Sequence, residues 1–428
     1  MHYGNESPIM KVFDPILRGR RSGGTVVRVV SALGAPLFAF AAKDNDITLS
    51  HLRSILILRL DEIGDLVLTT PFLRELRRNA PQAWISLVVN PETRNLVEFC
   101  PYVNEVLAFN WRFNGRLAGL WRHARALAFA ARHLWQRFDL AIVGRWGADH
   151  YEATFLAYFS GAAWRVAYSE HLHEVKSRLN RGYDRLLTQA LESTGPKHQV
   201  EWNLDFLLPL GGKVQDSRLE LWLTDDDRTY ARKTLAAHGV EGGELLIAFA
   251  PGAGARRRCW PLERWIDLGR RLGRKFGPRL VIVGSKREED LGAYIEGALG
   301  SGVINLVGCA TLRQTSAILE CCSLTVSNDS GPMHLAAAAG SAVVEISCHP
   351  RGGDPNHENS PMHFHPWGVP YFVVQPESPT APCSISCESN VPHCILGIEV
   401  ESVQQAVRDL LLRICAYTPE TRASANVN

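Results

Sequence analysis

Ile55-Leu-Ile-Leu-Arg-Leu-Asp-Glu-Ile-Gly-Asp-Leu-Val-Leu-Thr-Thr-Pro71 is the stretch that decides the fold of this chain. Ile55–Leu60 is a nearly continuous apolar run, which is typical of a strand buried on both faces of a parallel sheet. A glycine turn and a carboxylate at Asp65 follow, and Pro71–Asn79 predicts a helix. Open α/β sheets bind ligands at the carboxyl ends of their strands, so Asp65 lies where a ligand would be held. From its spacing alone, Asp65 fits a proton acceptor and a helix cap equally well.

The same alternation continues after this stretch. Trp84–Val89, Val106–Phe109 and Leu140–Val143 predict three more strands, and Leu117–Phe138 predicts a long basic helix with apolar spacing. Strands that alternate with helices in this way predict a parallel sheet covered by helices on both faces.

The second half of the chain repeats this architecture with its own strands. Each predicted strand ends in small or polar residues, which is the pattern of the ligand-facing edge of a doubly wound sheet. The four runs are Leu245–Ala250, Leu280–Val283, Leu324–Ser327 and Ala342–Ser347. A last helix is expected over Ser402–Leu412.

Two α/β domains follow from this repetition and from the length of the chain. A chain of 428 residues exceeds what one hydrophobic core usually supports. The polar run Thr224–Asp227 can cap the helix of Arg228–His238, so we place an inter-domain linker around residues 211–224. The predicted domains are residues 51–212 and 225–415, with an N-terminal extension over residues 1–50 and a tail over residues 416–428.

Composition limits the classes of partner. The net charge of +2, with 21% charged residues, argues against a nucleic-acid-binding field over the whole chain. Ten cysteines are too few and too scattered for a secreted disulfide scaffold, which favours a reducing compartment. We therefore expect a cytoplasmic protein that does not bind nucleic acid.

The N-terminal segment is both basic and apolar. Arg18–Arg21 precedes the apolar run Thr25–Ala42, a combination that resembles a signal peptide. Arg28 interrupts the run, and the uninterrupted part is shorter than the roughly 20 residues of a membrane span. We expect a peripheral anchor on the inner face of the cytoplasmic membrane; a poorly ordered extension with one apolar helix is the alternative.

The motif Ser327-Asn-Asp-Ser-Gly-Pro-Met-His-Leu-Ala-Ala-Ala-Ala-Gly340 indicates a phosphate site. A strand leads into a polar turn, and an alanine-rich helix follows. The backbone amides of Ser330 and Gly331 would point at the crevice, with the positive end of the helix dipole behind them. A plain capped helix, with Asp329 as its cap, explains part of this motif but leaves His334 unexplained.

A second motif, Pro251-Gly-Ala-Gly-Ala-Arg-Arg-Arg-Cys-Trp-Pro261, places a glycine loop and three arginines after a predicted strand. Gly252 and Gly254 allow a ligand to approach the backbone, and Arg257 and Arg258 can grip a diphosphate by paired hydrogen bonds. A solvated charge cluster is the alternative. The chain has no Gly-x-x-x-x-Gly-Lys-Ser/Thr loop, and no Gly-x-Gly-x-x-Gly follows the first strand, which disfavours P-loop hydrolases and dehydrogenases.

These motifs resemble glycosyltransferase family nine, the bacterial heptosyltransferases of lipopolysaccharide core assembly. The resemblance covers about residues 54–415 and is carried by the opening stretch, by Pro-Gly-Ala-Gly with Arg-Cys-Trp-Pro, and by Ser-Asn-Asp-Ser-Gly-Pro-Met-His-Leu-Ala-Ala. It implies an α/β GT-B fold of two facing Rossmann-like domains with parallel sheets, the acceptor on the first and the nucleotide-sugar on the second. It also implies an inverting reaction that needs no metal or cofactor and uses a nucleotide-diphospho-sugar as substrate.

The resemblance assigns roles by position. Asp65, beside Gly64, looks like the general base that deprotonates the acceptor hydroxyl. Arg258 stands where the family has a lysine that contacts the donor phosphates. The other donor-side residues are a ribose-binding acid at Glu288, or its neighbour Glu289, and a pocket formed by Asp329, Ser330, Gly331 and His334.

The chain departs from the family in two places. Asp61 and Glu62, which we also place on the acceptor side, stand where well-known heptosyltransferases often carry two small hydroxyl residues. The identity of the acceptor therefore stays open. Three arginines replace one lysine, so the register of the phosphate contact is open as well.

Residues 349–394 contain several histidines and cysteines. They can be read as metal ligands, but they lack a paired Cys-x-x-Cys spacing. We therefore assign no metal site and expect a loop that closes over the donor. The residues are His349, His357, His363, His365, Cys383, Cys387 and Cys394.

The expected function is transfer of a heptose or related sugar from a nucleotide-sugar donor to a lipopolysaccharide or other surface glycan, which can be lipid-linked. The expected partners are thus the donor, the acceptor and a membrane surface. A non-catalytic polysaccharide-assembly protein of the same fold and a nucleotide-sugar epimerase are the alternatives. Retention of Asp65 and of the Asn-Asp-Ser-Gly-Pro-Met-His motif argues against the first, and the epimerase would need no separate acceptor.

Overall fold

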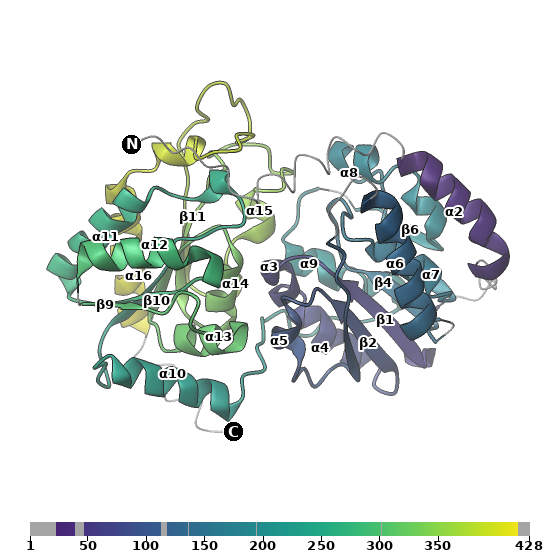
Figure 1. The fold of residues 1–428 in the computed structure, drawn as a ribbon, viewed down its shortest axis with the longest axis horizontal. Helices are drawn as coiled ribbons and strands as arrows, with labels where there is room; N and C mark the ends of the chain where they lie inside the picture. Colours follow the sequence, from purple (N-terminus) through teal and green to yellow (C-terminus); the bar gives the residue numbers. More distant parts are fainter. Residues whose placement is uncertain are drawn as a thin grey trace.

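The computed structural model describes residues 23–38, 47–112, 118–135, 137–193, 195–300 and 302–417. They form two lobes of similar build, each with a six-stranded parallel sheet between layers of helices (Figure 1). The expectation of two facing Rossmann-like domains is therefore confirmed.

The first sheet has the strand order β3-β2-β1-β4-β5-β6. Its central strand is β1, where Leu56 lies opposite Ser86 of β2 and Ala141 of β4. The apolar run of the opening stretch thus forms the middle of the sheet, and every residue of Ile55–Leu60 is buried. The strands are β1 (Ser54–Arg59), β2 (Trp84–Val89), β3 (Glu105–Ala108), β4 (Leu140–Val143), β5 (Trp164–Tyr168) and β6 (Gln189–Leu191).

The second sheet has the order β12-β11-β10-β7-β8-β9, which is the same winding read from the other edge. Each sheet therefore has one switch point, between β1 and β4 and between β7 and β10, where open α/β sheets bind their ligands. The strands are β7 (Leu246–Ala250), β8 (Arg279–Ile282), β9 (Val303–Asn305), β10 (Leu324–Asn328), β11 (Ala342–Ile346) and β12 (Tyr371–Val374).

Helices cover both faces of each sheet (Figure 1). The helices of the first lobe are α2 (Gly23–Phe38), α3 (Ile63–Val67), α4 (Thr70–Asn79), α5 (Arg94–Val97), α6 (Ala118–His133), α7 (Ala153–Phe159), α8 (Glu174–Leu179) and α9 (Gln199–Leu204). The helices of the second lobe are α10 (Asp225–Ala237), α11 (Leu262–Phe276), α12 (Glu289–Leu299), α13 (Leu312–Glu320), α14 (Gly331–Ala338), α15 (Pro361–Phe364) and α16 (Val400–Tyr417). The predicted cap of α10 is present, because Thr224 and Asp227 exchange hydrogen bonds in a capping box.

The connection between the lobes, residues 211–224, contains no helix or strand. Arg74 of α4 fixes it to the first lobe. The guanidinium of Arg74 donates to the carbonyl oxygen of Arg218 at 2.8 Å and lies 3.0 Å from the carboxylate of Glu220. The second lobe also holds the connection, because Nε1 of Trp367 donates to the carbonyl oxygen of Ser217 at 2.8 Å.

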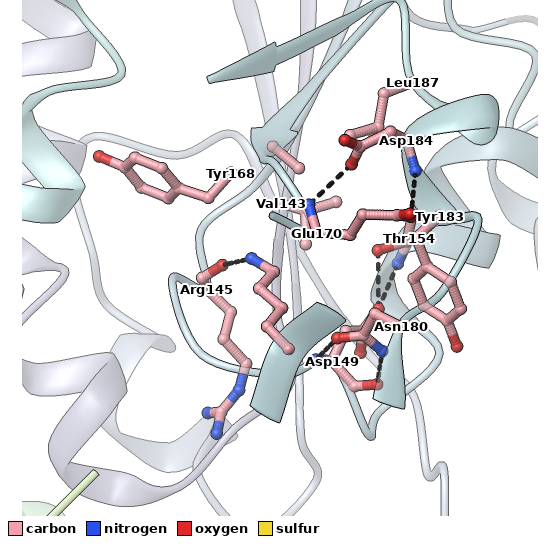
Figure 2. A pocket seen from close by; sticks show the side chains of 12 residues that line it. Val143, Arg145, Asp149, Thr154, Tyr168, Glu170, Asn180, Tyr183, Asp184 and Leu187 are labelled. Carbon is pink, nitrogen blue, oxygen red and sulfur yellow. Dashed lines mark hydrogen bonds between the residues drawn. The ribbon is translucent and has the colours of Figure 1, made fainter. Parts of the chain in front are cut away.

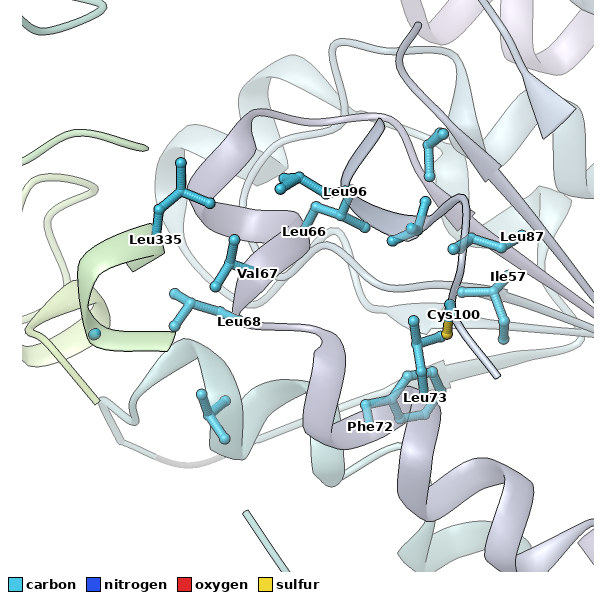
Figure 3. Packing of buried hydrophobic residues seen from close by; sticks show 14 of the residues in the cluster. Ile57, Leu66, Val67, Leu68, Phe72, Leu73, Leu87, Leu96, Cys100 and Leu335 are labelled. Carbon is cyan, nitrogen blue, oxygen red and sulfur yellow. The ribbon is translucent and has the colours of Figure 1, made fainter. Parts of the chain in front are cut away.

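The two lobes touch through α3 and α14 at the centre of the molecule (Figure 1). Leu66, Val67 and Leu68 lie in one buried cluster with Leu335 of α14 (Figure 3). Because α3 follows β1 and α14 follows β10, this seam joins the carboxyl ends of the two sheets. A Cβ added at Gly331 would lie 2.9 Å from the Cβ of Ile63, so the start of α14 packs directly on α3.

The N-terminal helix α2 lies on the outside of the first lobe, away from the second (Figure 1). Val27 is buried there, close to the turn at Gly182. None of the described helices is long and apolar enough to cross a membrane. Residues 1–22 and 39–46, which hold the basic lead and the end of the apolar run, lie outside the described residues.

Candidate active site

Asp65 lies in α3, just after β1, and its side chain is 16% exposed. Its Oδ1 accepts a hydrogen bond from Nη2 of Arg59 at 3.4 Å. Burial and the negative charge of Asp61 raise the pKa of Asp65, and the positive charges of Arg59 and Arg145 oppose that rise. The N-cap position of α3 belongs to Glu62, so Asp65 does not cap this helix. A partly accessible carboxylate with a raised pKa has the properties of a general base.

Asp61 is buried, and two guanidinium groups hold its carboxylate. Its Oδ1 lies 3.2 Å from Nε of Arg59, and its Oδ2 lies 2.9 Å from Nη1 of Arg145. Both arginines act electrostatically on Asp65, so Asp61 positions the charges around the candidate base. Glu62, by contrast, is exposed.

A buried histidine of the second lobe closes the seam over Gly64. A Cβ added at Gly64 would lie 2.4 Å from Cδ2 of His334, so no larger residue fits while the seam is closed. Burial and the positive charges of His365 and Arg258 lower the pKa of His334 to about 3, so its imidazole is neutral. Its Nδ1 has no hydrogen-bond partner among the described residues. The ring of His334 thus packs against the residue next to Asp65 and carries a buried nitrogen that the described residues leave unpaired.

The start of α14 has the form that the phosphate motif predicts. Ser330 occupies the N-cap position, but its side chain makes no capping hydrogen bond. Asp329 points elsewhere, because its Oδ2 lies 3.4 Å from Nη1 of Arg258. The helix-cap alternative for Asp329 is therefore wrong. Positive potential at the start of α14 has two sources. They are the amino end of the helix, with Gly331, and the guanidinium of Arg258.

The three arginines form a short 3₁₀ turn, Arg256–Arg258, after β7. Nε of Arg258 donates to Oδ1 of Asn359 at 3.0 Å, and this partner is buried. Arg257 instead pairs with the exposed carboxylate of Glu358 at 3.1 Å. Of these two arginines, Arg258 is the one that reaches the start of α14.

Glu288 lies against the glycine loop that follows β7. A Cβ added at Gly252 would lie 1.6 Å from Oε1 of Glu288, so glycine is required beside this carboxylate. The other oxygen, Oε2, accepts hydrogen bonds from the amide and hydroxyl of Ser285 at 2.6 and 2.8 Å. Asn328, at the end of β10, donates from Nδ2 to the carbonyl oxygen of Pro251 at 2.6 Å and holds this loop at the switch point.

Glu288 and its neighbour Glu289 face different loops. A Cβ added at Gly308 would lie 2.8 Å from Oε1 of Glu289, so Glu289 faces a different loop from Glu288. Glu288 is therefore the acid at the glycine loop. A Cβ added at Gly254 would meet no atom within 4 Å, so the middle of the loop faces open space.

A cavity of about 10 Å³ lies next to Arg145 (Figure 2). The polar side chains in its wall are bonded to neighbouring groups. Oδ1 of Asn180 accepts from the amide of Asp149 at 2.7 Å, and Nζ of Lys176 donates to the carbonyl oxygen of Trp146 at 2.9 Å. A volume of this size holds at most one water molecule. The cavity is thus part of the support of the Arg145 loop and is too small for a sugar.

The four histidines considered as metal ligands do not belong to the cluster that the cysteines of the same segment form in the described structure. His349 stacks on His357, with ring centroids 5.6 Å apart. His363 and His365 face the first lobe, where their rings pack on those of Trp146 and His198. A ligand set that combines these histidines with Cys383, Cys387 and Cys394 is therefore not formed.

Several residues of the site were missed by sequence reasoning. Arg59 and Glu345 carried a signal, since each is a charged residue inside an apolar strand. Glu345 is buried, and burial together with the charge of Asp329 raises its pKa well above the usual range. Arg145 and Asn359 carried no signal, because they lie in loops and meet the site only in the folded chain.

Comparisons with known proteins decide the family. A family model described as glycosyltransferase family 9 (heptosyltransferase) matches residues 130–347, which is half of the chain. The chain belongs to glycosyltransferase family 9. Among named relatives, lipopolysaccharide heptosyltransferase 2 of Escherichia coli strain K12 is 24% identical over 303 residues, which cover 68% of this chain and 82% of that protein.

Solved structures share the fold of this chain. The family 9 glycosyl transferase from Veillonella parvula DSM 2008 superposes with a TM-score of 0.67 at 22% identity, covering 86% of this chain and 100% of that one. The E. coli heptosyltransferase WaaC with ADP superposes with a TM-score of 0.61 at 17% identity. The superposition covers 83% of this chain and 99% of that one. This family 9 glycosyltransferase has the GT-B fold, so the expected family, fold and enzyme class are confirmed.

Proposed function

We propose that this glycosyltransferase moves a heptose or closely related sugar from an ADP-heptose-type donor to a lipopolysaccharide core acceptor, with inversion at the anomeric carbon. The observation that carries the proposal is the convergence at the α3–α14 seam. The ring of His334 packs there against Gly64, the residue before Asp65, and Arg258 lies close enough to sense the charge of Asp65. The relatives that support the substrate class are heptosyltransferases by name, and one was solved with ADP.

The donor diphosphate would lie at the start of α14. The free amides of Ser330 and Gly331 and the guanidinium of Arg258 supply the positive potential that a diphosphate requires. The same groups stabilise the charge that develops on the leaving diphosphate, so transfer does not require a metal. Glu288, beside the glycine loop, would accept hydrogen bonds from the ribose hydroxyls.

The acceptor hydroxyl would meet Asp65 from the first lobe. Asp65 accepts the hydroxyl proton while the hydroxyl oxygen bonds to the anomeric carbon. The bond from that carbon to the diphosphate oxygen breaks on the opposite side, which inverts the centre. Arg59 supports the ionised form of Asp65, and Asp61 holds Arg59 in place.

The location we propose is the inner face of the cytoplasmic membrane, where a lipid-linked acceptor would be held. Helix α2 supports this placement, because it is an apolar helix on the outside of the first lobe with Val29 49% exposed. A helix of this kind can lie in the membrane surface without crossing it.

The decisive experiment incubates the protein with ADP-heptose, with and without deacylated or lipid-linked core acceptors. We expect ADP release only when an acceptor is present, an unchanged rate when Mg²⁺ is added to or left out of the assay, and an inverted linkage by NMR. A changed sugar without acceptor would indicate an epimerase. Donor binding without release under any condition would indicate a non-catalytic assembly protein.

A further inference from the structure

Four potential metal ligands meet in the segment between β12 and α16. Cys383, Cys387, His393 and Cys394 each offer one ligand atom, and these atoms all lie within 4.8 Å of one another. Cys387 and Cys394 are buried, and the other two are partly buried. Sequence reasoning overlooked His393, because it weighed the four earlier histidines and looked for a Cys-x-x-Cys pair.

The distances in this cluster match a tetrahedral zinc site. Nδ1 of His393 lies 3.5 Å from Sγ of Cys383 and 3.5 Å from Sγ of Cys394. In a tetrahedral site with Zn–N and Zn–S bonds of about 2.1 and 2.3 Å, the nitrogen and sulfur atoms are about 3.6 Å apart. The ligand atoms therefore need little movement to hold the ion.

The second nitrogen of His393 is placed as a zinc ligand requires. Nε2 lies 3.1 Å from the carbonyl oxygen of Ala381, which fixes the ring proton on Nε2 and leaves the lone pair of Nδ1 facing the sulfur atoms. Histidine ligands usually donate their other N–H to a carbonyl or carboxylate in this way.

The cluster lies against the predicted donor side. Cys394 begins the 3₁₀ turn Cys394–Gly397, which packs on the turn Arg256–Arg258. Trp260, two residues after that turn, donates from Nε1 to the carbonyl oxygen of Ile398 at 2.9 Å. Apart from this short turn, the described chain between β12 and α16 forms no helix or strand, so it has few backbone hydrogen bonds of its own to fix it.

We propose that Cys383, Cys387, His393 and Cys394 bind one Zn²⁺, and that this ion fixes the segment which supports the arginine turn. Three thiolates and one neutral imidazole fill all four positions, which is the form of a structural zinc site and leaves no position for substrate. The metal thus has no part in sugar transfer. Binding of the ion does not depend on the proposed function. The effect of the ion on donor binding through the arginine turn does rest on the proposed function.

Metal analysis of the untagged full chain tests the assignment. We expect about one zinc per chain by mass spectrometry, and for protein reloaded with Co²⁺ the thiolate-to-cobalt absorption of a tetrahedral site. His393→Gln should lose most of the zinc, whereas His393→Cys should keep it. Cys321→Ser, which removes an exposed cysteine elsewhere, should leave the zinc content unchanged.

A proteolysis measurement then tests the supporting role. Removal of zinc by a strong chelator should raise the rate of cleavage within residues 376–398 by at least tenfold and weaken ADP binding. Protein that contains no metal and gives no cobalt absorption would overturn the proposal, and so would full zinc content in His393→Gln. Iron in place of zinc would overturn the choice of metal. These readouts do not depend on transfer, so failure of the zinc site and failure of the proposed function are distinguishable.

Discussion

At the scale of single residues, the reactivity of Asp65 depends on its neighbours. Because burial and Asp61 raise the pKa of Asp65, turnover should fall as the pH drops through an acidic range above the usual carboxyl pKa of about 3.9. Asp65→Asn should lower kcat by about 100- to 10,000-fold, since it removes the proton acceptor. ADP affinity by calorimetry should stay within twofold, and Asp409→Asn, at a partly exposed position of α16, is the matched control. Unchanged kcat in Asp65→Asn would refute the assignment.

Lys176 provides a test of the network beside Arg145. Burial lowers the pKa of Lys176 to about 7, whereas an unfolded lysine has a pKa of about 10.4. Between these two pH values the unfolded chain binds more protons than the folded chain, so the contribution of Lys176 to the free energy of unfolding increases with pH. This contribution is lost as the pH falls to 7. The free energy of unfolding of wild type, relative to Lys176→Met, should therefore increase from pH 7 to 10. The difference in the free energy of unfolding between wild type and Lys275→Met, at an exposed lysine, should not change with pH. A difference for Lys176→Met that does not change with pH would contradict the lowered pKa of Lys176.

At the scale of elements, the contact of α3 with α14 depends on one missing side chain. Gly64→Ala places a methyl group 2.4 Å from Cδ2 of the buried His334 ring, so either this ring or one of the two helices must shift. Within a helix, the change from glycine to alanine alone would stabilise by about 1 kcal/mol, so a loss must come from the seam. A displacement of about 1 Å can lower the rate about 100-fold, and we expect a loss of that order.

The readout for Gly64→Ala is kcat together with ADP affinity. The affinity should change less than kcat, because Gly64 belongs to the acceptor-side lobe. Gly297→Ala is the matched control, since a Cβ added at that exposed position of α12 meets no atom within 4 Å. Wild-type turnover in Gly64→Ala would show that the lobes do not need this close approach.

The elements also show what the sequence could reveal. β1 and β2 were predicted because their apolar runs are long and continuous. α10 was predicted because the residues of its capping box, Thr224 and Asp227, lie within one stretch of four residues. β6 and β9 were not, because each spans three residues and forms only where a neighbouring strand supplies its hydrogen bonds. Asp65 and the start of α14 sit in contiguous motifs, so the sequence could indicate them as candidates. Arg145 and His393, placed by tertiary contacts alone, were not indicated.

At the scale of the whole molecule, the lobes are held together by more than the central seam. Arg313 of α13 crosses between them. Its Nη1 donates to the carbonyl oxygen of Asn95 at 2.7 Å and lies 3.0 Å from the carboxylate of Glu98, both in the first lobe. Its guanidinium also lies over the ring of Phe99, 4.5 Å from the centroid. Because interfaces between domains of one chain usually permit relative motion, such a contact sets how often the two half-sites meet.

Arg313→Ala should therefore shift the enzyme toward an open arrangement. We expect a larger radius of gyration by small-angle scattering and a fall in kcat/KM of about 10- to 100-fold, since Asp65 and the donor half-site then align less often. ADP affinity should hold, because the predicted donor residues all belong to the second lobe. Arg271→Ala, which removes ion pairs within that lobe alone, should change neither measurement. If Arg313→Ala weakened ADP binding as much as turnover, the residue would act on the donor lobe itself and closure would not depend on it.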